Sequence, residues 1–381
     1  MKHYKMIDVV SEISERENSP STSGYDRFVG LEHYISGEVE IANYGTTANL
    51  DSAMKVFHSG DILVARRNVY LKRASIAFFD GLTSGDSIVL RAKDDRIARL
   101  LPFVLNTDAF WDYADQYSDG TMSKRLSPKT LMQYEFDLPD EDRQDYLADT
   151  LWAAAETKTS YQRLLAQTDE LVKSQFIDMF GDPVDNPFQW PTVPLLQLGD
   201  CKNGMNFHSK DSGVEINCLG VGDFKDYSVI DNTAELPMIS LNETPSEEYM
   251  LHDGDIVFVR SNGNKTLVGR CLVVYPHDIP TTYSGFCIRF RKKSTAALTD
   301  YLLRYLKADS VRAKMAGRGA NIQNLNQQIL VSLQVPIPPK ELQRQFIDLV
   351  YQTDKAKLEL TQTIDSVSSF IKSLIQQDFS N

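Results

Sequence analysis

One group of residues matches the sequence motif of a metal-dependent nuclease site. Pro139-Asp140 is followed further along the chain by Glu156-Thr157-Lys158. That chemistry requires the acidic groups to converge on one divalent metal ion. The segment between them reads as one helix, which places Asp140 about four turns from Glu156. We therefore interpret these residues as part of a helix and not as a catalytic centre.

Other catalytic patterns are equally weak. The six histidines are scattered without the spacing of metal ligands, and no Gly-x-Ser-x-Gly motif is present. Gly220-Val221-Gly222 is more typical of a turn than of a nucleotide-binding loop. The four cysteines, which include no C-x-x-C pair, are expected to be small buried residues: Cys201, Cys218, Cys271 and Cys287. The sequence thus predicts no metal site and no catalytic residues.

Polar side chains suited to DNA cluster instead, at matching places in the two halves of the chain. Arginine can bond guanine through two atoms, asparagine and glutamine can do so with adenine, and lysine and serine suit phosphates. Ordinary solvated loops are the alternative, but the repetition in both halves favours binding. The candidates are Arg66, Arg67, Asn68, Tyr70, Lys72, Arg73, Ser123, Lys124 and Arg125 in the first half, and Arg260, Ser261, Asn262, Asn264, Lys265, Arg318, Asn321, Gln323 and Asn324 in the second.

The elements that must position these loops occur twice. His58-Ser59-Gly60-Asp61-Ile62-Leu63-Val64-Ala65-Arg66 is echoed by His252-Asp253-Gly254-Asp255-Ile256-Val257-Phe258-Val259-Arg260. Phe28–Tyr34 is echoed by Cys218–Phe224, in the same order along the chain. A repeat of this length indicates two copies of one unit. Each copy has a globular part of about 140–150 residues and a polar helical part of about 40.

Short β-rich runs and helical segments alternate in each globular part. The helical pattern of Asp300–Met315 places Tyr301, Leu302, Tyr305, Leu306 and Val311 on one side. The expected fold class is α/β (α+β), with two similar globular domains. Runs bounded by Gly, Asp, Ser and Pro predict strands at Ile62–Ala65, Ile88–Arg91, Ile256–Arg260, Cys271–Tyr275 and Phe286–Phe290.

Two long heptad repeats give the clearest structural prediction. Each begins after a proline, and each would form a helix about 60 Å long. We expect the two helices to pack as an antiparallel coiled coil, because one such helix alone would leave its apolar stripe in water. The alternative is that each helix packs only on its own globular half. The expected partner-binding and coiled-coil residues are Leu147, Leu151, Tyr161, Leu165, Val172, Leu342, Phe346, Leu349, Leu360, Val367, Phe370 and Leu374, with Lys158 and Gln175 as polar interruptions.

Composition excludes wholesale disorder and leaves nucleic acid possible. The 381 residues are 42% hydrophobic and 24% charged, as in ordinary globular proteins. The net charge of −12 resides mainly in the helical segments, since residues 138–187 contain 4 basic and 11 acidic side chains, whereas residues 188–340 contain 16 and 15. No apolar run is long enough to span a membrane and no signal peptide is visible at the start, so a cytoplasmic protein without a membrane partner is expected.

The chain resembles the specificity subunit of a type I restriction–modification system over essentially its whole length. The resemblance depends on the duplicated Gly-Asp-Ile-Leu/Val…Arg block and on the segments that flank each helix. Val335–Phe346 and Leu171–Pro183 are similar to the family's helical conserved regions. Leu138-Pro139-Asp140-Glu141-Asp142 lacks the double proline and the glutamine spacing, so its helix is expected to start differently.

The resemblance implies the following organisation and partners. Residues 1–137 and 188–337 would be target-recognition domains, residues 138–187 a central spacer helix with linker, and residues 338–381 a C-terminal spacer helix. The chain would be a non-catalytic subunit that reads an asymmetric bipartite site in double-stranded DNA. Two methyltransferase subunits would dock on the helices, and restriction and motor subunits would join through that core. S-adenosylmethionine, ATP and magnesium would be used by the partners, with no cofactor bound by this chain.

The main alternative is a protein-interaction scaffold that does not read DNA. The acidic helices suit a protein partner under either hypothesis. A stand-alone nuclease or methyltransferase is a third reading, but it needs a metal or S-adenosylmethionine site that the sequence does not offer.

Overall fold

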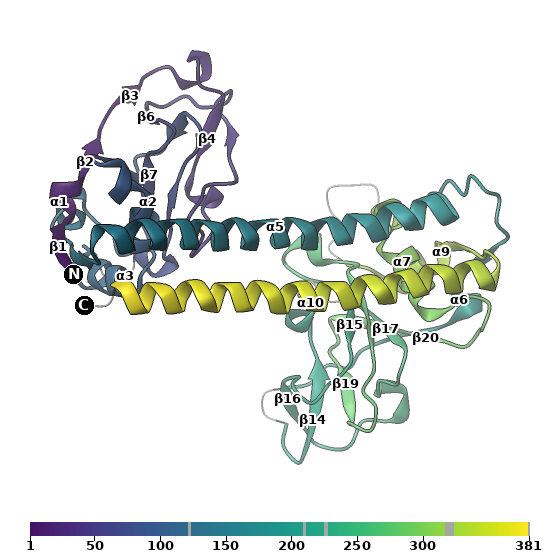
Figure 1. Ribbon diagram of the computed structural model, residues 1–381. Coiled ribbons are helices and arrows are strands. Elements are labelled where there is room, and N and C mark those ends of the chain that lie inside the picture. Colours follow the sequence, from purple (N-terminus) through teal and green to yellow (C-terminus); the bar gives the residue numbers. More distant parts are fainter. Residues whose placement is uncertain (121–122, 209–210, 225–227, 317–323, 380–381) are drawn as a thin grey trace. The chain divides into compact units, whose positions relative to one another are not determined.

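The computed structural model describes residues 1–120, 123–208, 211–224, 228–316 and 324–379. The chain divides into two compact units. The N-terminal unit comprises Met1–Leu164 and Leu360–Asn381, and the C-terminal unit comprises Leu165–Glu359. The long helices α5 (Glu141–Phe180) and α10 (Lys340–Phe379) each contribute one part to each unit (Figure 1). The compact units therefore divide each helix, whereas the division expected from the sequence kept each helix whole.

In the N-terminal unit, two sheets pack face to face and helices cover the outer face of the first. The first sheet has the strand order β2-β10-β7-β8, the second has the order β3-β6-β9-β4-β5, and β1 pairs with β11. The elements are β1 (Lys2–Lys5), α1 (Met6–Val9), β2 (Val10–Ile13), β3 (Arg16–Glu17), β4 (Arg27–Val29), β5 (Gly45–Thr46), β6 (Met54–Phe57), β7 (Ile62–Ala65), β8 (Ala74–Ile76), β9 (Gly81–Thr83), β10 (Ser87–Ala92), α2 (Asp95–Val104), α3 (Asp108–Tyr117), α4 (Pro128–Leu131) and β11 (Glu135–Leu138).

Alternation along the central strands explains this layered core. Ile62 and Ile88 pack with the helices on one face of the first sheet. Leu63 and Val89, one residue further on, pack against Phe57 of the second sheet. Because both faces are covered, these strands read as nearly continuous apolar runs in the sequence.

The C-terminal unit repeats this plan. Its main sheet has the order β13-β20-β17-β18-β15, a further sheet has the order β16-β14-β19, and β12 pairs with β21. The elements are β12 (Thr192–Pro194), α6 (Leu195–Leu198), β13 (Gly199–Asn203), β14 (Val214–Leu219), β15 (Val229–Ile230), β16 (Met238–Leu241), β17 (Asp255–Val259), β18 (Cys271–Val274), β19 (Thr281–Tyr283), β20 (Cys287–Lys292), α7 (Thr299–Lys307), α8 (Asp309–Ala316), α9 (Gln327–Ser332) and β21 (Gln334–Pro336).

The internal repeat is visible in topology as well as in sequence. Strand β20 lies between β13 and β17, as β10 lies between β2 and β7. The parallel pair β4–β9, with Phe28 opposite Leu82, has its counterpart in β14–β19, with Cys218 opposite Thr282. Two copies of one mixed α/β fold are therefore present, as the sequence predicted.

One predicted helix is divided. The pattern over 300–315 indicated a single helix, but α7 ends at Lys307 and α8 begins at Asp309. Between them Ala308 has ψ 138°, an extended value that ends the helical hydrogen-bond series. The apolar side that defined the prediction is nevertheless buried, including Tyr301, Tyr305 and Val311.

Helices α5 and α10 pack antiparallel within each unit. In the N-terminal unit, Arg143 near the start of α5 donates to both carboxylate oxygens of Asp378 near the end of α10, at 3.0 and 2.8 Å. In the C-terminal unit, Phe176 near the end of α5 lies against Phe346 near the start of α10, with ring centroids 5.4 Å apart. Both helices also pack on the globular part of each unit, so the two packing alternatives occur together.

Burial along the helices follows the predicted heptads with one exception. Phe370, placed in the buried seam by its spacing, is 48% exposed. The reason is that the buried face of α10 turns from Val367 toward Ile371 near the end of the helix, so that Phe370 lies at the margin. Leu147, Leu151, Val172 and Phe346 are buried, and Tyr161, Leu165, Leu342, Leu349, Leu360, Val367 and Leu374 are partly buried.

The polar interruption at Lys158 has a specific partner. Its ammonium group lies 2.8 Å from the carboxylate of Glu38, and both side chains are less than one-fifth exposed. Gln162 donates to the same carboxylate at 3.0 Å. A loop of the globular part thereby anchors the helix at the point where the apolar stripe is interrupted.

The start of α5 corrects the expectation that it would differ from that of α10. The Gln144 side chain donates to the carbonyl oxygen of Pro139 at 2.8 Å, and that of Gln343 donates to the carbonyl oxygen of Pro338 at 2.9 Å. Both helices thus begin with the same side-chain bond five residues after a proline. The missing second proline of the first copy does not alter this start.

Candidate nucleic-acid interface

A buried ion pair fixes each strand that leads to a candidate loop. Asp61 is 1% exposed and is bound by the guanidinium of Arg91 through two bonds of 2.7 Å. Asp255 receives the same two-bond contact from Arg291, at 2.9 and 2.8 Å. Such paired bonds are among the stronger hydrogen bonds in proteins. The recurring Gly-Asp is therefore more than a turn signal, because its carboxylate ties β7 to β10 and β17 to β20.

The turns before these strands require their glycines. Gly60 and Gly254 have φ values of +94° and +83°, which glycine adopts without strain. The next carboxylate then accepts the backbone N–H three residues earlier, from His58 to Asp61 at 2.8 Å. The second copy has the same bond at 2.8 Å.

The structure brings together the two candidate loops of the N-terminal unit. Arg67 and Arg125 face each other across an antiparallel bridge, and the Leu126 N–H donates to the carbonyl oxygen of Arg66 at 2.8 Å. Ser123 also donates to the Asn68 side chain at 3.0 Å. Segments almost sixty residues apart in the chain therefore lie side by side.

The same frame exists in the C-terminal unit. Ser261 faces Asn324 across an antiparallel bridge, and the Leu325 N–H donates to the carbonyl oxygen of Arg260 at 2.7 Å. These contacts match those of the first unit position by position. Arg318, Asn321 and Gln323 lie outside the described residues, as does the side chain of Lys265.

Most basic candidates of the N-terminal unit bond to acidic groups or to the backbone. Lys72 lies 2.5 Å from Asp108, and this contact holds the pKa of the Asp108 carboxyl below its usual value. Lys124 lies 2.5 Å from Asp115. Arg73 donates to two backbone carbonyl oxygens, and burial lowers its pKa. These three side chains consequently shape the loops as much as they offer charge.

The other candidates differ in exposure. Tyr70 is 66% exposed. Burial, followed by the nearby charge of Arg125, lowers the pKa of Arg66, which also donates to the Leu126 carbonyl oxygen at 3.1 Å. In the other unit, Arg260 donates to the Gly285 carbonyl oxygen at 3.1 Å, and the side chains of Asn262 and Asn264 accept backbone N–H groups of their own loop.

Two residues of these surfaces were not predicted. Asp86 contacts both Arg67 and Arg125, and Phe286 is 60% exposed beside Arg260. A signal for both existed in the sequence, because Ser84-Gly85-Asp86 and Ser284-Gly285-Phe286 occupy the same place in the repeat. Neither side chain is basic or an amide, so residue type alone does not mark it as a base contact.

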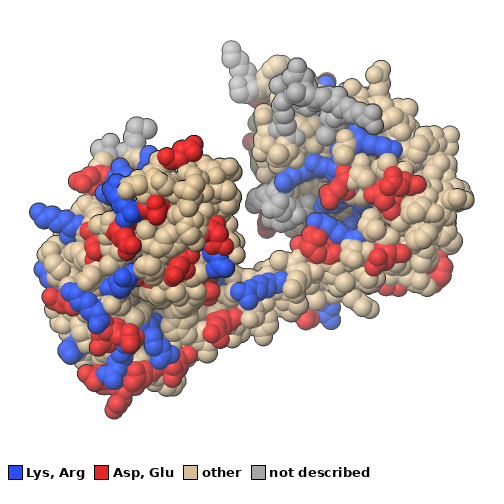
Figure 2. All heavy atoms as spheres, turned by 90° about the horizontal axis from the view of Figure 1, so that it is seen from above, with Lys and Arg blue, Asp and Glu red and all other residues tan. Residues whose placement is uncertain are grey.

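Charges on the surface are mixed. On the face drawn in Figure 2, Lys and Arg are interspersed with Asp and Glu instead of forming a field of one sign. This agrees with the ion pairs described above and with the overall negative charge. On this face, an anion would be recognised locally and not by a broad basic field.

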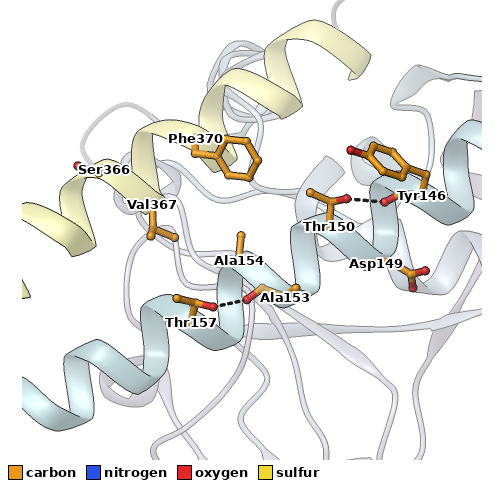
Figure 3. A pocket seen from close by; sticks show the side chains of 9 residues that line it. All are labelled: Tyr146, Asp149, Thr150, Ala153, Ala154, Thr157, Ser366, Val367 and Phe370. Atoms are coloured by element: carbon orange, nitrogen blue, oxygen red, sulfur yellow. Dashed lines mark hydrogen bonds between the residues drawn. The ribbon is translucent and has the colours of Figure 1, made fainter.

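A shallow apolar groove marks the paired helices of the N-terminal unit. It has a volume of about 700 Å³ and lies between α5 and α10. Figure 3 shows Val367 and Phe370 on one side of it, with Ala154 directed toward them from α5. Its lining is completed by Tyr146, Asp149, Thr150, Ala153, Thr157 and Ser366.

The side chains that could bind a metal ion are dispersed within the described ranges. Those residues contain no group of three or more His, Cys, Asp or Glu side chains able to hold a metal ion. The aspartate of the nuclease-like motif caps the start of α5 instead, since Asp140 accepts the backbone N–H of Arg143 at 3.1 Å.

Burial raises the pKa of the Cys201 thiol to about 12.

None of the helices in the part of the chain that the structure describes has the length and apolar character needed to cross a membrane.

Comparison with known structures identifies the fold. The S subunit of a type I restriction–modification system from M. genitalium superposes with a TM-score of 0.56 at 14% identity, covering 100% of this chain and 96% of that one. A chain from a study of complex assembly and conformational transition in the type I R-M system gives 0.57 at 17% identity, covering 99% and 96%. The fold is therefore that of type I specificity subunits.

Sequence comparison agrees. Residues 220–367 match the family described as the type I restriction modification DNA specificity domain, which confirms the resemblance seen in the sequence. The specificity subunit of the type I restriction enzyme EcoDI from Escherichia coli is 25% identical over 177 residues, 45% of this chain and 39% of that protein. The StySPI specificity subunit from Salmonella potsdam is 26% identical over 192 residues, 47% and 40%. The matches span about two fifths of these relatives.

Proposed function

We propose that this chain is the DNA specificity subunit of a type I restriction–modification complex. It binds an asymmetric bipartite site in double-stranded DNA, with two half-sites separated by a fixed spacer, and directs methylation and cleavage by partner subunits. The observation that carries the proposal is the matched frame of the two units. The same bridge and the same backbone bond present Arg67 and Arg125 in one unit, but Ser261 and Asn324 in the other.

The long helices are the proposed docking surface for the partner subunits. Two methyltransferase subunits dock on α5 and α10, and restriction and motor subunits join through that core. The apolar groove beside Phe370 supports such docking, because an exposed aromatic side chain on a polar helix suits a protein partner. The chain itself catalyses nothing and binds no cofactor. S-adenosylmethionine, ATP and magnesium belong to the partners.

A protein-interaction scaffold without DNA reading is the second candidate. One observation favours it: Lys72 and Lys124 are engaged with aspartates and are less available to phosphates. The surface of mixed charge in Figure 2 is consistent with it. The two functions differ in their response to salt and to DNA sequence.

The deciding experiment is a gel shift of the full chain co-expressed with its methyltransferase, at several salt concentrations. The methylated motif of the host genome supplies the probe, and the same bases in shuffled order supply the control. A specificity subunit prefers the motif, and its affinity falls steeply as salt rises because phosphate contacts release counterions. Equal binding to both probes, or none, would contradict the proposal and favour the scaffold.

A further inference from the structure

The loop that enters the central strand occupies one place in both units but carries different chemistry. Ser84-Gly85-Asp86 precedes β10, and Ser284-Gly285-Phe286 precedes β20. The Arg66 N–H donates to the carbonyl oxygen of Asp86 at 2.9 Å, and the Arg260 N–H donates to that of Phe286 at 2.7 Å. Positions 86 and 286 are therefore structural equivalents beside the proposed reading loops.

In the N-terminal unit this position holds a carboxylate between two guanidinium groups. Asp86 contacts Arg125 through one oxygen and Arg67 through the other, at 3.4 Å for Arg67. The arginine side chains remain 48% and 50% exposed, whereas Asp86 is 23% exposed. One carboxylate cannot neutralise two guanidinium groups, so the cluster keeps a net positive charge and holds two arginine forks side by side. An arginine fork matches the O6 and N7 atoms of guanine.

In the C-terminal unit the same positions carry no charge. Ser261 replaces Arg67, Asn324 replaces Arg125, and Phe286 replaces Asp86. The Phe286 ring is 60% exposed, although exposing it to water is unfavourable. Asn324 and Phe286 together suit an A·T pair. Asparagine can bond adenine, and an apolar side chain can contact the thymine methyl group.

We propose that this position sets the class of base pair read by each unit. Asp86 is a positioning residue that holds Arg67 and Arg125 for guanine, and Phe286 is a contact residue for the methyl group of thymine. The inference depends on the proposed function, since it assigns chemistry to the two halves of the same DNA site.

The test uses the complex of the full chain with its methyltransferase and base analogues within the motif. Each guanine is replaced in turn by 7-deazaguanine, which lacks N7, and each thymine by uracil, which lacks the methyl group. The wild-type complex should lose affinity at a guanine of one half-site and at a thymine of the other. For the guanine we expect a measurable loss that stays below about 150-fold, the upper value for a whole two-bond contact, because 7-deazaguanine keeps the O6 acceptor.

Variants then connect each loss to its residue. Asp86→Asn should reduce the penalty for 7-deazaguanine, whereas Asp86→Glu should retain it. The salt dependence of Asp86→Asn should not become shallower, because the substitution removes a negative charge. Phe286→Ala should remove the penalty for uracil, and Phe286→Leu should keep part of it. The controls are Asp51→Asn, an exposed aspartate of the same unit, and Met238→Ala, which is also 60% exposed.

The outcomes separate the two levels of the proposal. Absence of any preference for the motif would sink the proposed function itself. Two results would overturn only the assignment of these residues while leaving motif binding intact. In the first, the wild type tolerates uracil at every thymine. In the second, Asp86→Asn and Phe286→Ala leave both penalties unchanged. Melting temperatures equal to that of the wild type exclude a general loss of folding.

Discussion

At the scale of single residues, Arg289 is the least expected feature of the core. Its side chain is 3% exposed on β20, and the equivalent residue in the other unit is Val89. One of its nitrogens lies 3.2 Å from Asp200, while its Nε and Nη1 atoms have no hydrogen-bond partner within the described structure. Burying an incompletely bonded cation costs free energy. Asp200 has a second cationic partner, Lys293, at 2.8 Å.

We therefore expect Arg289→Met to leave the C-terminal unit as stable as before or to stabilise it, by up to about 3 kcal/mol. The flexible thioether fills a similar volume, and Asp200 keeps its contact with Lys293. Thermal and urea unfolding of the full chain provide the measurement, with Arg291→Met as the matched control. The control removes the two-bond partner of Asp255 and should destabilise the chain. A destabilised Arg289→Met variant would show instead that the guanidinium contributes an essential bond.

At the scale of elements, the two long helices have the same length and share one exposed apolar position. Each contains forty residues, and Leu171 occupies the place in α5 that Phe370 occupies in α10. Both side chains are 48% exposed. A helix pair already packed on two globular parts gains nothing from exposing these side chains, so their repetition favours equivalent docking sites for partner proteins.

Under the proposed function, substitution of these positions should remove methyltransferase subunits one at a time. We expect Phe370→Asp and Leu171→Asp each to reduce the number bound from two to one, and the double variant to bind none, because a buried carboxylate at an interface costs several kcal/mol. Native mass spectrometry of the co-expressed complex counts the subunits. Lys372→Ala and Lys173→Ala, two residues further along each helix, are the matched controls. Full occupancy in the double variant would place the docking surface elsewhere.

At the scale of the whole molecule, duplication supplies two copies of one frame on one chain, which act as two readers under the proposed function. The ion pairs Asp61–Arg91 and Asp255–Arg291 keep the same strand geometry in both copies, although the surrounding loops have diverged. Under the proposed function, an asymmetric DNA target is expected from that divergence. The helices that contribute to both units are then the natural determinant of the spacer, as the separation of two readers determines half-site spacing in other DNA-binding proteins.

Removal of one heptad from both helices should shorten the spacer. Deleting residues 164–170 of α5 together with residues 352–358 of α10 removes the partners Asp169 and Lys357 as a pair, keeps Leu171 and Phe370, and keeps the heptads in phase. Seven residues correspond to about 10 Å of helix rise, or roughly three base pairs. Methylome sequencing of cells that carry the variant measures the motif. Removal of four residues from each helix, which breaks the heptad phase, should abolish methylation. An unchanged spacer after the heptad deletion would exclude the helices as its determinant.

The sequence by itself determined the duplication, the order of the main strands and the two helices. These are local properties: the apolar runs at 62–65 and 256–259 are covered on both faces, and the heptads repeat over forty residues. The chemistry of the candidate loops could also be anticipated, since residue type limits what a side chain can bond.

Only the tertiary structure decided which of these side chains are available to contact a partner molecule. Lys72 and Lys124 look free in the sequence but meet aspartates 36 and 9 residues away. Phe370 fits the heptad but lies at the margin of the packed face. Asp86 gains its role from two arginines that the chain brings together from both directions. Such pairings depend on contacts between distant segments, and local spacing carries no information about them.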